Sequence, residues 1–255
     1  MSSENDTAGA VTLDRRSGPY GEVVLRRRGA HHEIIANGVF LMDTSDGRSE
    51  RLLIRAAAGA LDPAAAAPAV LIGGLGVGFS LAEAAADPRW GRITVVEREP
   101  AVIEWHTGPA AGAPPLAHLS GAALADPRVG LVEADLLDHL ATAPYRYDAV
   151  CLDIDNGPDW TVTEGNSGLY APAGLAACFG RLTPGGVLAV WSARPSTGFE
   201  AALRTAGFTD VRTEEIPVRR GVPDAVHLAV RPPDDEARGE ADAGGEPRAG
   251  APRSP

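Results

Sequence analysis

The sequence contains no lysine, only two cysteines, few aromatic residues and no long apolar run. No apolar stretch approaches the roughly 18 to 20 residues that cross a bilayer, so we expect no contact with a membrane. Cys151 and Cys178 stand far apart without C-x-x-C spacing, which predicts two buried thiols and neither a disulfide nor a metal site. The start, MSSENDTAGA, is polar and acidic, which is not typical of a secretory signal. We therefore expect a cytoplasmic protein without a metal ion.

The charge is strongly unbalanced toward acid. All basic residues are arginines, and the formal net charge is −11. An acidic protein repels the phosphates of nucleic acids, so we expect neither DNA nor RNA as a partner. Cationic small molecules would instead be attracted to it, although excess negative charge also serves solubility.

The chain is long enough for one large domain with a small appendage. Residues 1–16 and 232–255 lack the apolar periodicity needed to offset the entropy of ordering, and we expect both to be disordered tails. Residues 17–48 alternate β-rich runs with turn signals, among them Asn37-Gly38, a strong signal for a two-residue hairpin. These residues predict a small N-terminal antiparallel β unit.

Residues 49–231 predict a Rossmann-like α/β domain. A helix is expected over 47–61, with Ser49 as its N-cap. Beyond Ala69, continuously apolar strands alternate with helices, a pattern typical of a mostly parallel sheet with helices on both faces. In such folds the ligand binds outside the carboxyl ends of the strands.

The carboxyl ends of the first four predicted strands carry either glycines or acids. The first strand runs into a glycine loop, VLIGGLGVGF, in which glycines without side chains let backbone N–H groups approach a ligand. An acid after the second strand, about 20 residues beyond the loop, is typical of a residue that accepts both ribose hydroxyls of a nucleoside. The residues expected to bind a nucleoside are Gly74, Gly76, Gly78, Glu97 and Asp135, the last through the exocyclic amine of adenine.

The spacing within the loop distinguishes classes of nucleotide. Gly74, Gly76 and Gly78 form G-x-G-x-G, whereas dinucleotide-binding folds carry G-x-G-x-x-G. No G-K-[ST] follows, which excludes a P-loop. The adenosine of a sulfonium donor therefore fits the loop better than NAD or ATP does.

The chain resembles the polyamine aminopropyltransferases, the spermidine synthases, within the class I methyltransferase superfamily. The segments VLIGGLGVG, VVEREPAVIEW, DPRVGLVEAD, YDAVCLDIDNGP and LTPGGVLAVWSA follow the order and spacing of that family. The resemblance implies decarboxylated S-adenosylmethionine as donor, an amine as acceptor, no metal, and a homodimer.

Three positions depart from the family pattern. The Asp of the family's glycine loop corresponds to Gly76. The family's Y-H-E corresponds to Arg48-Ser49-Glu50, so that Glu50 alone is kept as a residue of the acceptor site. The family's D-x-x-D corresponds to Asp153-Ile154-Asp155-Asn156, in which the second acid stands one residue early.

Acids follow the fourth predicted strand in DIDNGPDWTVTEG, including Glu164. An amine must lose a proton before it attacks carbon, and clustered carboxylates bind ammonium groups well. We expect Asp153 to hold the amine of the donor or the acceptor and Asp155 to accept the proton, although Asp and Asn before Gly-Pro also make ordinary turns. The expected acceptor-binding residues are Glu50, Asn156, Asp159, Trp160 and Tyr170.

Two further hypotheses stay open. A carboxylate in the glycine loop would disfavour S-adenosylmethionine, which has a carboxylate of its own, and Gly76 removes that objection. On the first hypothesis, the chain is therefore an S-adenosylmethionine-dependent methyltransferase. Alternatively, it is a non-catalytic relative that keeps Glu97 and Asp135 and binds nucleosides without turnover.

Overall fold

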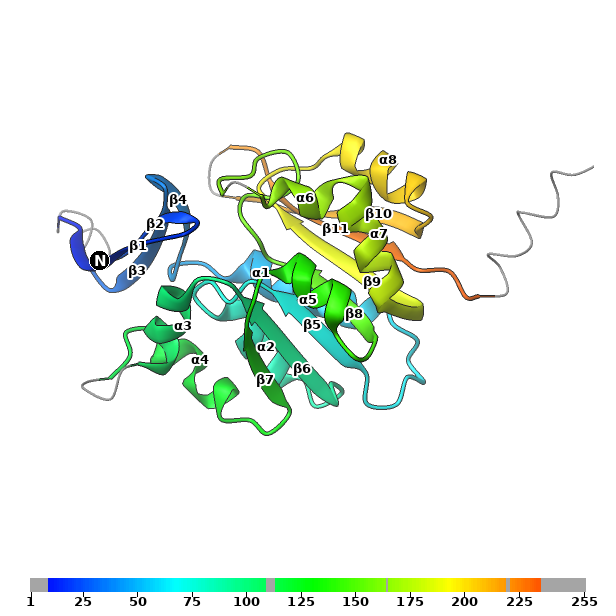
Figure 1. Cartoon of the computed structure of the whole chain (residues 1–255), viewed down its shortest axis with the longest axis horizontal. Coiled ribbons are helices and arrows are strands. Elements are labelled where there is room, and N and C mark those ends of the chain that lie inside the picture. Colours follow the sequence, from blue (N-terminus) through cyan, green and yellow to red (C-terminus); the bar gives the residue numbers. More distant parts are fainter. Residues whose placement is uncertain (1–8, 109–112, 164, 219–220, 235–255) are drawn as a thin grey trace, which may run out of the picture.

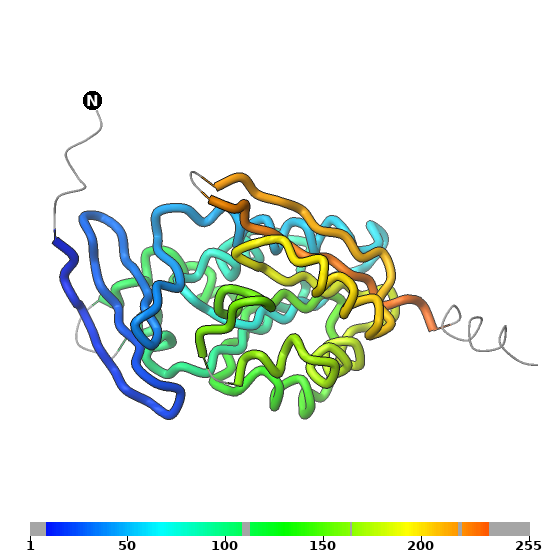
Figure 2. Tube along the Cα trace, turned by 90° about the horizontal axis from the view of Figure 1, so that it is seen from above, coloured from blue at the N-terminus to red at the C-terminus, as the bar shows by residue number. Residues whose placement is uncertain are grey.

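The computed structural model describes residues 9–108, 113–163, 165–218 and 221–234. Within them, a small antiparallel sheet precedes a larger α/β domain (Figure 1). The small sheet has the order β1-β2-β3-β4, with strands β1 Val11–Gly18, β2 Gly21–Arg28, β3 His31–Ala36 and β4 Val39–Asp43. Figure 2 shows this sheet as a separate layer at one end of the molecule.

The larger sheet has seven strands in the order β10-β11-β9-β8-β5-β6-β7. Its strands are β5 Ala69–Gly73, β6 Arg92–Glu97, β7 Val129–Glu133, β8 Tyr147–Leu152, β9 Leu182–Ser192, β10 Thr209–Ile216 and β11 Asp224–Val230. The strands from β5 to β9 pair in parallel, and β11 pairs antiparallel with both β9 and β10. The chain leaves β5 toward β6 on one side and returns to β8 on the other, so the crevice between β5 and β8 is the switch point where such sheets bind ligands.

Helices cover both faces of this sheet. One face carries α1 Arg48–Ala60, α2 Phe79–Ala86, α3 Pro100–Thr107 and α4 Ala117–Leu124. The other face carries α5 Leu136–Thr142, α6 Ser167–Tyr170, α7 Pro172–Arg181 and α8 Thr197–Thr205. None of the helices in the described ranges is long and apolar enough to cross a membrane.

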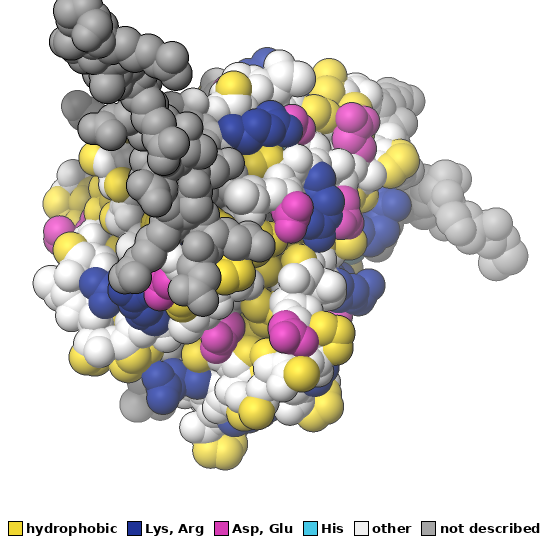
Figure 3. Space-filling view, turned by 90° about the vertical axis from the view of Figure 1, so that its right-hand side faces the viewer, with side chains coloured by type: hydrophobic (Ala, Val, Ile, Leu, Met, Phe, Trp, Pro, Cys, Tyr) yellow, Lys and Arg dark blue, Asp and Glu magenta, His cyan; other side chains and the backbone are white. Residues whose placement is uncertain are grey.

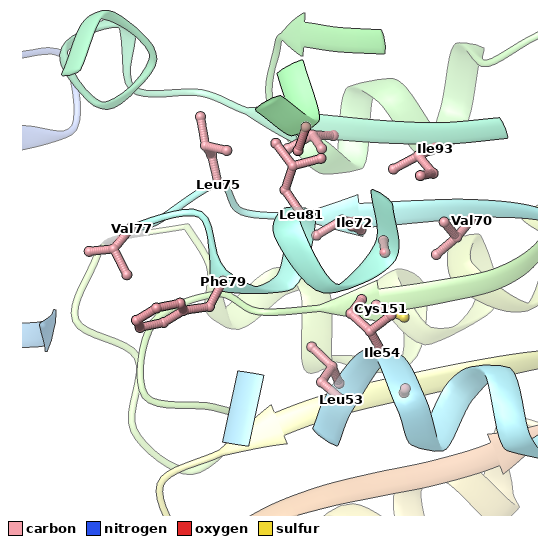
Figure 4. Close-up of a cluster of buried hydrophobic side chains, with 14 of the residues drawn as sticks. Leu53, Ile54, Val70, Ile72, Leu75, Val77, Phe79, Leu81, Ile93 and Cys151 are labelled. Atoms are coloured by element: carbon pink, nitrogen blue, oxygen red, sulfur yellow. The ribbon is translucent and has the colours of Figure 1, made fainter. Parts of the chain in front are cut away.

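The core beneath α1 anchors the part of this helix that faces the cavity. Leu53 and Ile54 of α1 are fully buried. Figure 4 shows them in one apolar cluster with Val70, Ile72, Phe79, Leu81 and Cys151. One turn earlier, Ser49 and Glu50 are also buried although they are polar. Apolar packing therefore fixes a helix whose first turn carries polar groups out of solvent.

The fold expected from the sequence is confirmed, including the small β unit and the helices on both faces of the sheet. The predicted Asn37-Gly38 hairpin joins β3 to β4, with positive φ at both residues (52° and 79°), as a type I′ turn requires. The described part of the expected C-terminal tail, residues 232–234, lies outside any helix or strand. The rest of that tail and residues 1–8 lie outside the described residues.

The prediction of a disordered N-terminal tail is wrong for residues 11–16, which belong to β1. This strand is almost entirely exposed, so it shows no apolar periodicity in the sequence. Backbone pairing with β2 holds it. Two contacts to α3 add to that pairing: Trp105 Nε1–H donates to Asp14 at 2.9 Å, and Arg16 pairs with Glu104 at 2.8 Å.

Two local features of the structure also differ from what the sequence predicts. Ser49 is not the N-cap of α1, because the helix begins at Arg48 after Gly47 and the Ser49 hydroxyl donates to Glu50 at 3.0 Å. Helix α4 was not predicted, since its short alanine-rich segment carries little periodicity. Figure 3 views the end of the molecule opposite the small sheet, where acidic and basic side chains are interspersed with hydrophobic ones.

Candidate active site

A cavity of about 630 Å³ lies between the small sheet and the carboxyl ends of β5, β6, β7 and β8. Strands β2, β3 and β4 supply the wall on one side, largely apolar, with Val23, Ile34 and Met42. The opposite wall holds the glycine loop and the strand-end acids. The cavity therefore lies at the switch point that the sheet topology indicates.

In the glycine loop, residues 73–78, the backbone at Gly74 and Gly76 lies too close to neighbouring atoms for a side chain to fit without displacing them. Gly74 has φ of +95°, and a Cβ there would collide with the main-chain oxygen of Asp153. Gly76 has φ of +49°, and a Cβ there would collide with Met42. Gly74 and Gly76 line the cavity as predicted. Gly78 does not line it and instead forms the N-cap of α2.

Glu97, at the end of β6, holds the loop from the cavity side. Its Oε2 accepts the Leu75 N–H and its Oε1 accepts the Glu99 N–H, both at 2.9 Å. A carboxylate has about four acceptor positions, so about two remain for a ligand such as a ribose. Burial raises the pKa of Glu97, against the effect of these backbone donors. The predicted position of Glu97 beside the loop is found.

Asp135 lies at the same end of the cavity and has a structural task as well. Its Oδ1 accepts the Leu137 N–H at 2.8 Å and caps α5. Arg98 lies 3.7 Å from its other oxygen and packs over the ring of Tyr20, with the guanidinium carbon 4.3 Å from the ring centroid. Asp135 thus offers one oxygen to a ligand, beside a cation and an aromatic ring from the small sheet.

Glu50 and Asp153 form a pair of acids on the β8 side of the glycine loop. Ser80 joins them: its hydroxyl lies 2.8 Å from Asp153 Oδ2 and 3.3 Å from the main-chain oxygen of Glu50. Burial and the Asp153 charge raise the pKa of Glu50 to about 8. Burial also raises the pKa of Asp153 to about 6. At pH 7 the pair therefore carries about one negative charge and has room for a cation.

More acids surround this pair. Asp224, at the start of β11, lines the cavity, and burial raises its pKa. Asp46 also lines the cavity and pairs with Arg48 at 2.7 Å. Of the described residues that line the cavity, Arg98 is the one basic side chain, and the acids are Asp43, Asp46, Glu50, Glu97, Glu99, Asp135, Asp153, Asp155 and Asp224. An excess of acids of this kind favours a ligand that carries positive charge.

Asp155 lines the cavity, but its carboxylate is occupied. It accepts the N–H groups of Val162 and Thr163 and the Thr163 hydroxyl, each at 3.2 Å, and the Asn166 amide at 2.7 Å. These four donors fill the usual acceptor capacity of a carboxylate. Its φ of +52° is also uncommon for a residue with a side chain. The geometry thus gives Asp155 the task of holding the loop over residues 155–166, which does not support its expected role as proton acceptor.

The residues expected to bind the acceptor divide into two groups. Glu50, Asn156 and Trp160 line the cavity, Trp160 with half of its surface exposed. Asp159 is exposed and is not part of the lining. Tyr170 is buried outside the cavity, where its hydroxyl donates to the main-chain oxygen of Ile154 at 3.0 Å. Glu164 lies outside the described residues.

His106 is a residue near the site that the sequence did not indicate. It lies in the last turn of α3 and is 2% exposed. Its Nε2 is 2.8 Å from the carbonyl oxygen of Gly76, and its Nδ1 is 2.6 Å from the Ser120 hydroxyl. Burial lowers the pKa of His106 to about 4, so the ring is neutral at pH 7. The sequence also did not indicate Asp224 and Arg98, which line the cavity, or Ser80, which hydrogen-bonds to Asp153, because only the folded chain brings these residues to their places.

Solved structures similar to this chain include two spermidine synthases and a precorrin decarboxylase. The first is a spermidine synthase in complex with the transition state analogue AdoDATO, with a TM-score of 0.71 and 18% identity over 88% of this chain and 74% of that one. Spermidine synthase from Thermotoga maritima has a TM-score of 0.67 and 16% identity over the same shares. Precorrin 8w decarboxylase from Methanobacterium thermoautotrophicum has a TM-score of 0.51 and 22% identity over 73% of this chain and 91% of that one.

No protein-family model matches the sequence, and no curated protein matches it. At such identities the similarity of the solved structures shows the fold. The resemblance to spermidine synthases read from the motifs is therefore confirmed in the fold of the chain.

Gly74→Ala should lower the free energy of unfolding by at least about 2 kcal/mol, because the residue has positive φ and its Cβ would meet the Asp153 backbone. Gly59→Ala is the matched control, since Gly59 lies exposed in α1 with open space around it. Gly59→Ala should raise the free energy of unfolding by about 0.5 to 1 kcal/mol. Urea unfolding of both variants measures the two effects. Equal free energies of unfolding for the two variants would contradict the close approach of the loop to the end of β8.

Glu50→Gln should raise the free energy of unfolding by about 2 to 4 kcal/mol at pH 8 and should leave it unchanged at pH 4. The pKa of Glu50 rises from 4.5 to about 8 in the folded chain. The stability that protonated Glu50 contributes is thus complete below pH 4.5 and is lost as the pH rises toward 8. Glu133→Gln, which changes an exposed acid of β7, should alter stability little at either pH. A gain for Glu50→Gln that is equal at both pH values would argue against a buried acid.

Proposed function

We propose that the chain is a spermidine synthase-like transferase. It moves an aminopropyl group from decarboxylated S-adenosylmethionine to an amine acceptor. The observation that carries the proposal is the acid lining of the cavity, with nine carboxylates and one arginine among the described residues. Both reactants bear positive charge. Neither has a carboxylate, so neither requires a basic side chain in the cavity. The fold, which is similar to that of a spermidine synthase in complex with AdoDATO, supports the same conclusion.

The adenosine of the donor belongs at the end of the cavity next to the glycine loop. Glu97 has free acceptor positions for the ribose hydroxyls. Asp135 offers an oxygen to the exocyclic amine of the base, while Arg98 and Tyr20 form a flat surface beside it. In this pose the sulfonium and the aminopropyl chain extend toward Glu50 and Asp153.

The reaction is a displacement at carbon. The acceptor nitrogen forms a bond to the aminopropyl carbon, the carbon–sulfur bond breaks, and 5′-methylthioadenosine leaves with the electron pair. The ammonium form of the acceptor must lose a proton before attack. We assign that proton to the Glu50–Asp153 pair, since raised pKa values make these acids better bases than an ordinary carboxylate. Asp155 remains a loop anchor in this scheme.

Methyl transfer from S-adenosylmethionine is the second candidate, and Gly76 favours it. The loop has no acid at this position, and a side chain there would have to displace the end of Met42. The carboxylate of S-adenosylmethionine would, however, lie close to Glu50 and Asp153 without a cation near them. We therefore place methyl transfer behind aminopropyl transfer. A small amine as acceptor, a homodimer and a cytoplasmic location remain parts of the proposal.

Calorimetric titration at pH 7 with decarboxylated S-adenosylmethionine, S-adenosylmethionine and 5′-methylthioadenosine tests the donor. The decarboxylated donor should bind at least tenfold more tightly than S-adenosylmethionine, because one carboxylate among buried acids costs several kcal/mol. Its ammonium should also displace up to about one proton from the acid pair, seen as a dependence of the heat on the buffer. Methylthioadenosine lacks the aminopropyl ammonium and should release no proton. Tighter binding of S-adenosylmethionine would instead favour methyl transfer, and binding of none would exclude the nucleoside site.

Release of methylthioadenosine from the decarboxylated donor in the presence of a panel of diamines tests turnover. Asp153→Asn should lower kcat at least a hundredfold, because the acceptor then loses both a partner and a base. Asp159→Asn is the matched control, since this neighbouring acid is exposed and does not line the cavity, and its kcat should not change. Binding without turnover by the unaltered chain would identify a non-catalytic nucleoside-binding protein.

A further inference from the structure

The glycine loop needs support from outside itself. Glycine gives the backbone freedom that must be lost when the loop is ordered around a ligand. On the cavity side that support comes from Glu97, which accepts the Leu75 N–H. On the side away from the cavity, a second group contacts the very next residue, Gly76, through its carbonyl oxygen. That group is the imidazole of His106.

The hydrogen bonds of His106 define its orientation. The Gly76 carbonyl can only accept, so Nε2 carries the proton and donates to it at 2.8 Å. Nδ1 is then the acceptor and takes the Ser120 hydroxyl at 2.6 Å. Ser120 lies in α4 and is completely buried. The chain Ser120–His106–Gly76 thus connects two helices to the loop through buried hydrogen bonds.

The third glycine of the G-x-G-x-G motif, Gly78, is explained by the same histidine. A Cβ on Gly78 would lie 3.1 Å from Ser120 Cβ and 3.2 Å from His106 Cε1. Gly78 also has φ of +97° and does not line the cavity. Its lack of a side chain therefore makes room for the imidazole, while the first two glycines make room for Asp153 and Met42.

We propose that His106 is a positioning residue that holds the glycine loop in its ligand-binding conformation. Glu97 and His106 fix successive residues of the loop from opposite sides. Loss of the His106 donor removes this hydrogen bond from the Gly76 carbonyl, on the side of the loop away from Glu97. The proposal rests on the proposed function in one respect, namely that this loop receives the donor nucleoside.

Hydrogen exchange of the loop amides, without any ligand, tests the positioning role itself. In His106→Leu, the amides of residues 74–80 should exchange about tenfold faster than in the unaltered chain, because a buried hydrogen bond is lost. His106→Gln keeps an N–H donor and should restore most of the protection. His139→Leu is the matched control: it removes a histidine that bonds to Tyr147 at 2.8 Å from α5, away from the loop, and should leave residues 74–80 unchanged.

Calorimetric titration of the same variants with 5′-methylthioadenosine tests the consequence for binding. His106→Leu should bind about tenfold more weakly, His106→Gln within about threefold of the unaltered chain, and His139→Leu equally well. If His106→Leu does not fold, Ser120→Ala replaces it, with about threefold effects expected in both measurements.

The outcomes separate this proposal from the proposed function. Unchanged loop exchange in His106→Leu, or in Ser120→Ala, overturns the positioning role whatever the chain binds. Faster exchange in the variant, with no binding of methylthioadenosine by the unaltered chain, supports the positioning role and overturns the nucleoside donor. Faster exchange of every region alike would show a loss of global stability and would also overturn the proposal.

Discussion

The close approach of Gly74 to the main chain of Asp153 is the contact on which the site depends. The Asp153 N–H donates to the Gly73 carbonyl at 2.9 Å, and Gly74 has no side chain that would separate the two strand ends. Because β5 and β8 meet in this way, the acid after β8 lies directly below the loop after β5. Ser80, in the first turn of α2, then reaches the Asp153 carboxylate. A wider separation would remove Asp153 from both the loop and Glu50.

The pair of Glu50 and Asp153 is held at a cost in stability. A buried acid with a raised pKa destabilises the folded state at neutral pH relative to a neutral side chain of the same shape. The apolar cluster under α1 in Figure 4 offsets that cost, since Leu53 and Ile54 fix the helix one turn beyond Glu50. Well-packed apolar residues thus lie next to a buried acid that a cationic ligand would compensate. Local conflict of this kind is typical of functional sites.

The sequence predicted the features that depend on local pattern. The parallel sheet follows from apolar strands alternating with helices, and Glu97 and Asp153 could be located because strand ends converge at one edge. Features that depend on long-range contacts could not be found in this way. The four donors that occupy Asp155, the withdrawal of Tyr170 into the core and the position of Asp224 at the cavity all come from packing. Strand β1 was missed because pairing, and not burial, holds it.

The acids on the two sides of the cavity differ in the donors and cations that neutralise their charge. This difference favours one orientation of a bound ligand over the opposite one. On the side of β6 and β7, Glu97 accepts backbone N–H groups, and Asp135 caps the N-terminus of α5 and lies near Arg98. On the side of β8, Glu50 and Asp153 accept hydroxyl groups of Ser49 and Ser80 and have raised pKa values. A ligand with neutral polar groups at one end and positive charge at the other satisfies both. The opposite orientation would place positive charge beside Arg98 and leave the buried acids uncompensated.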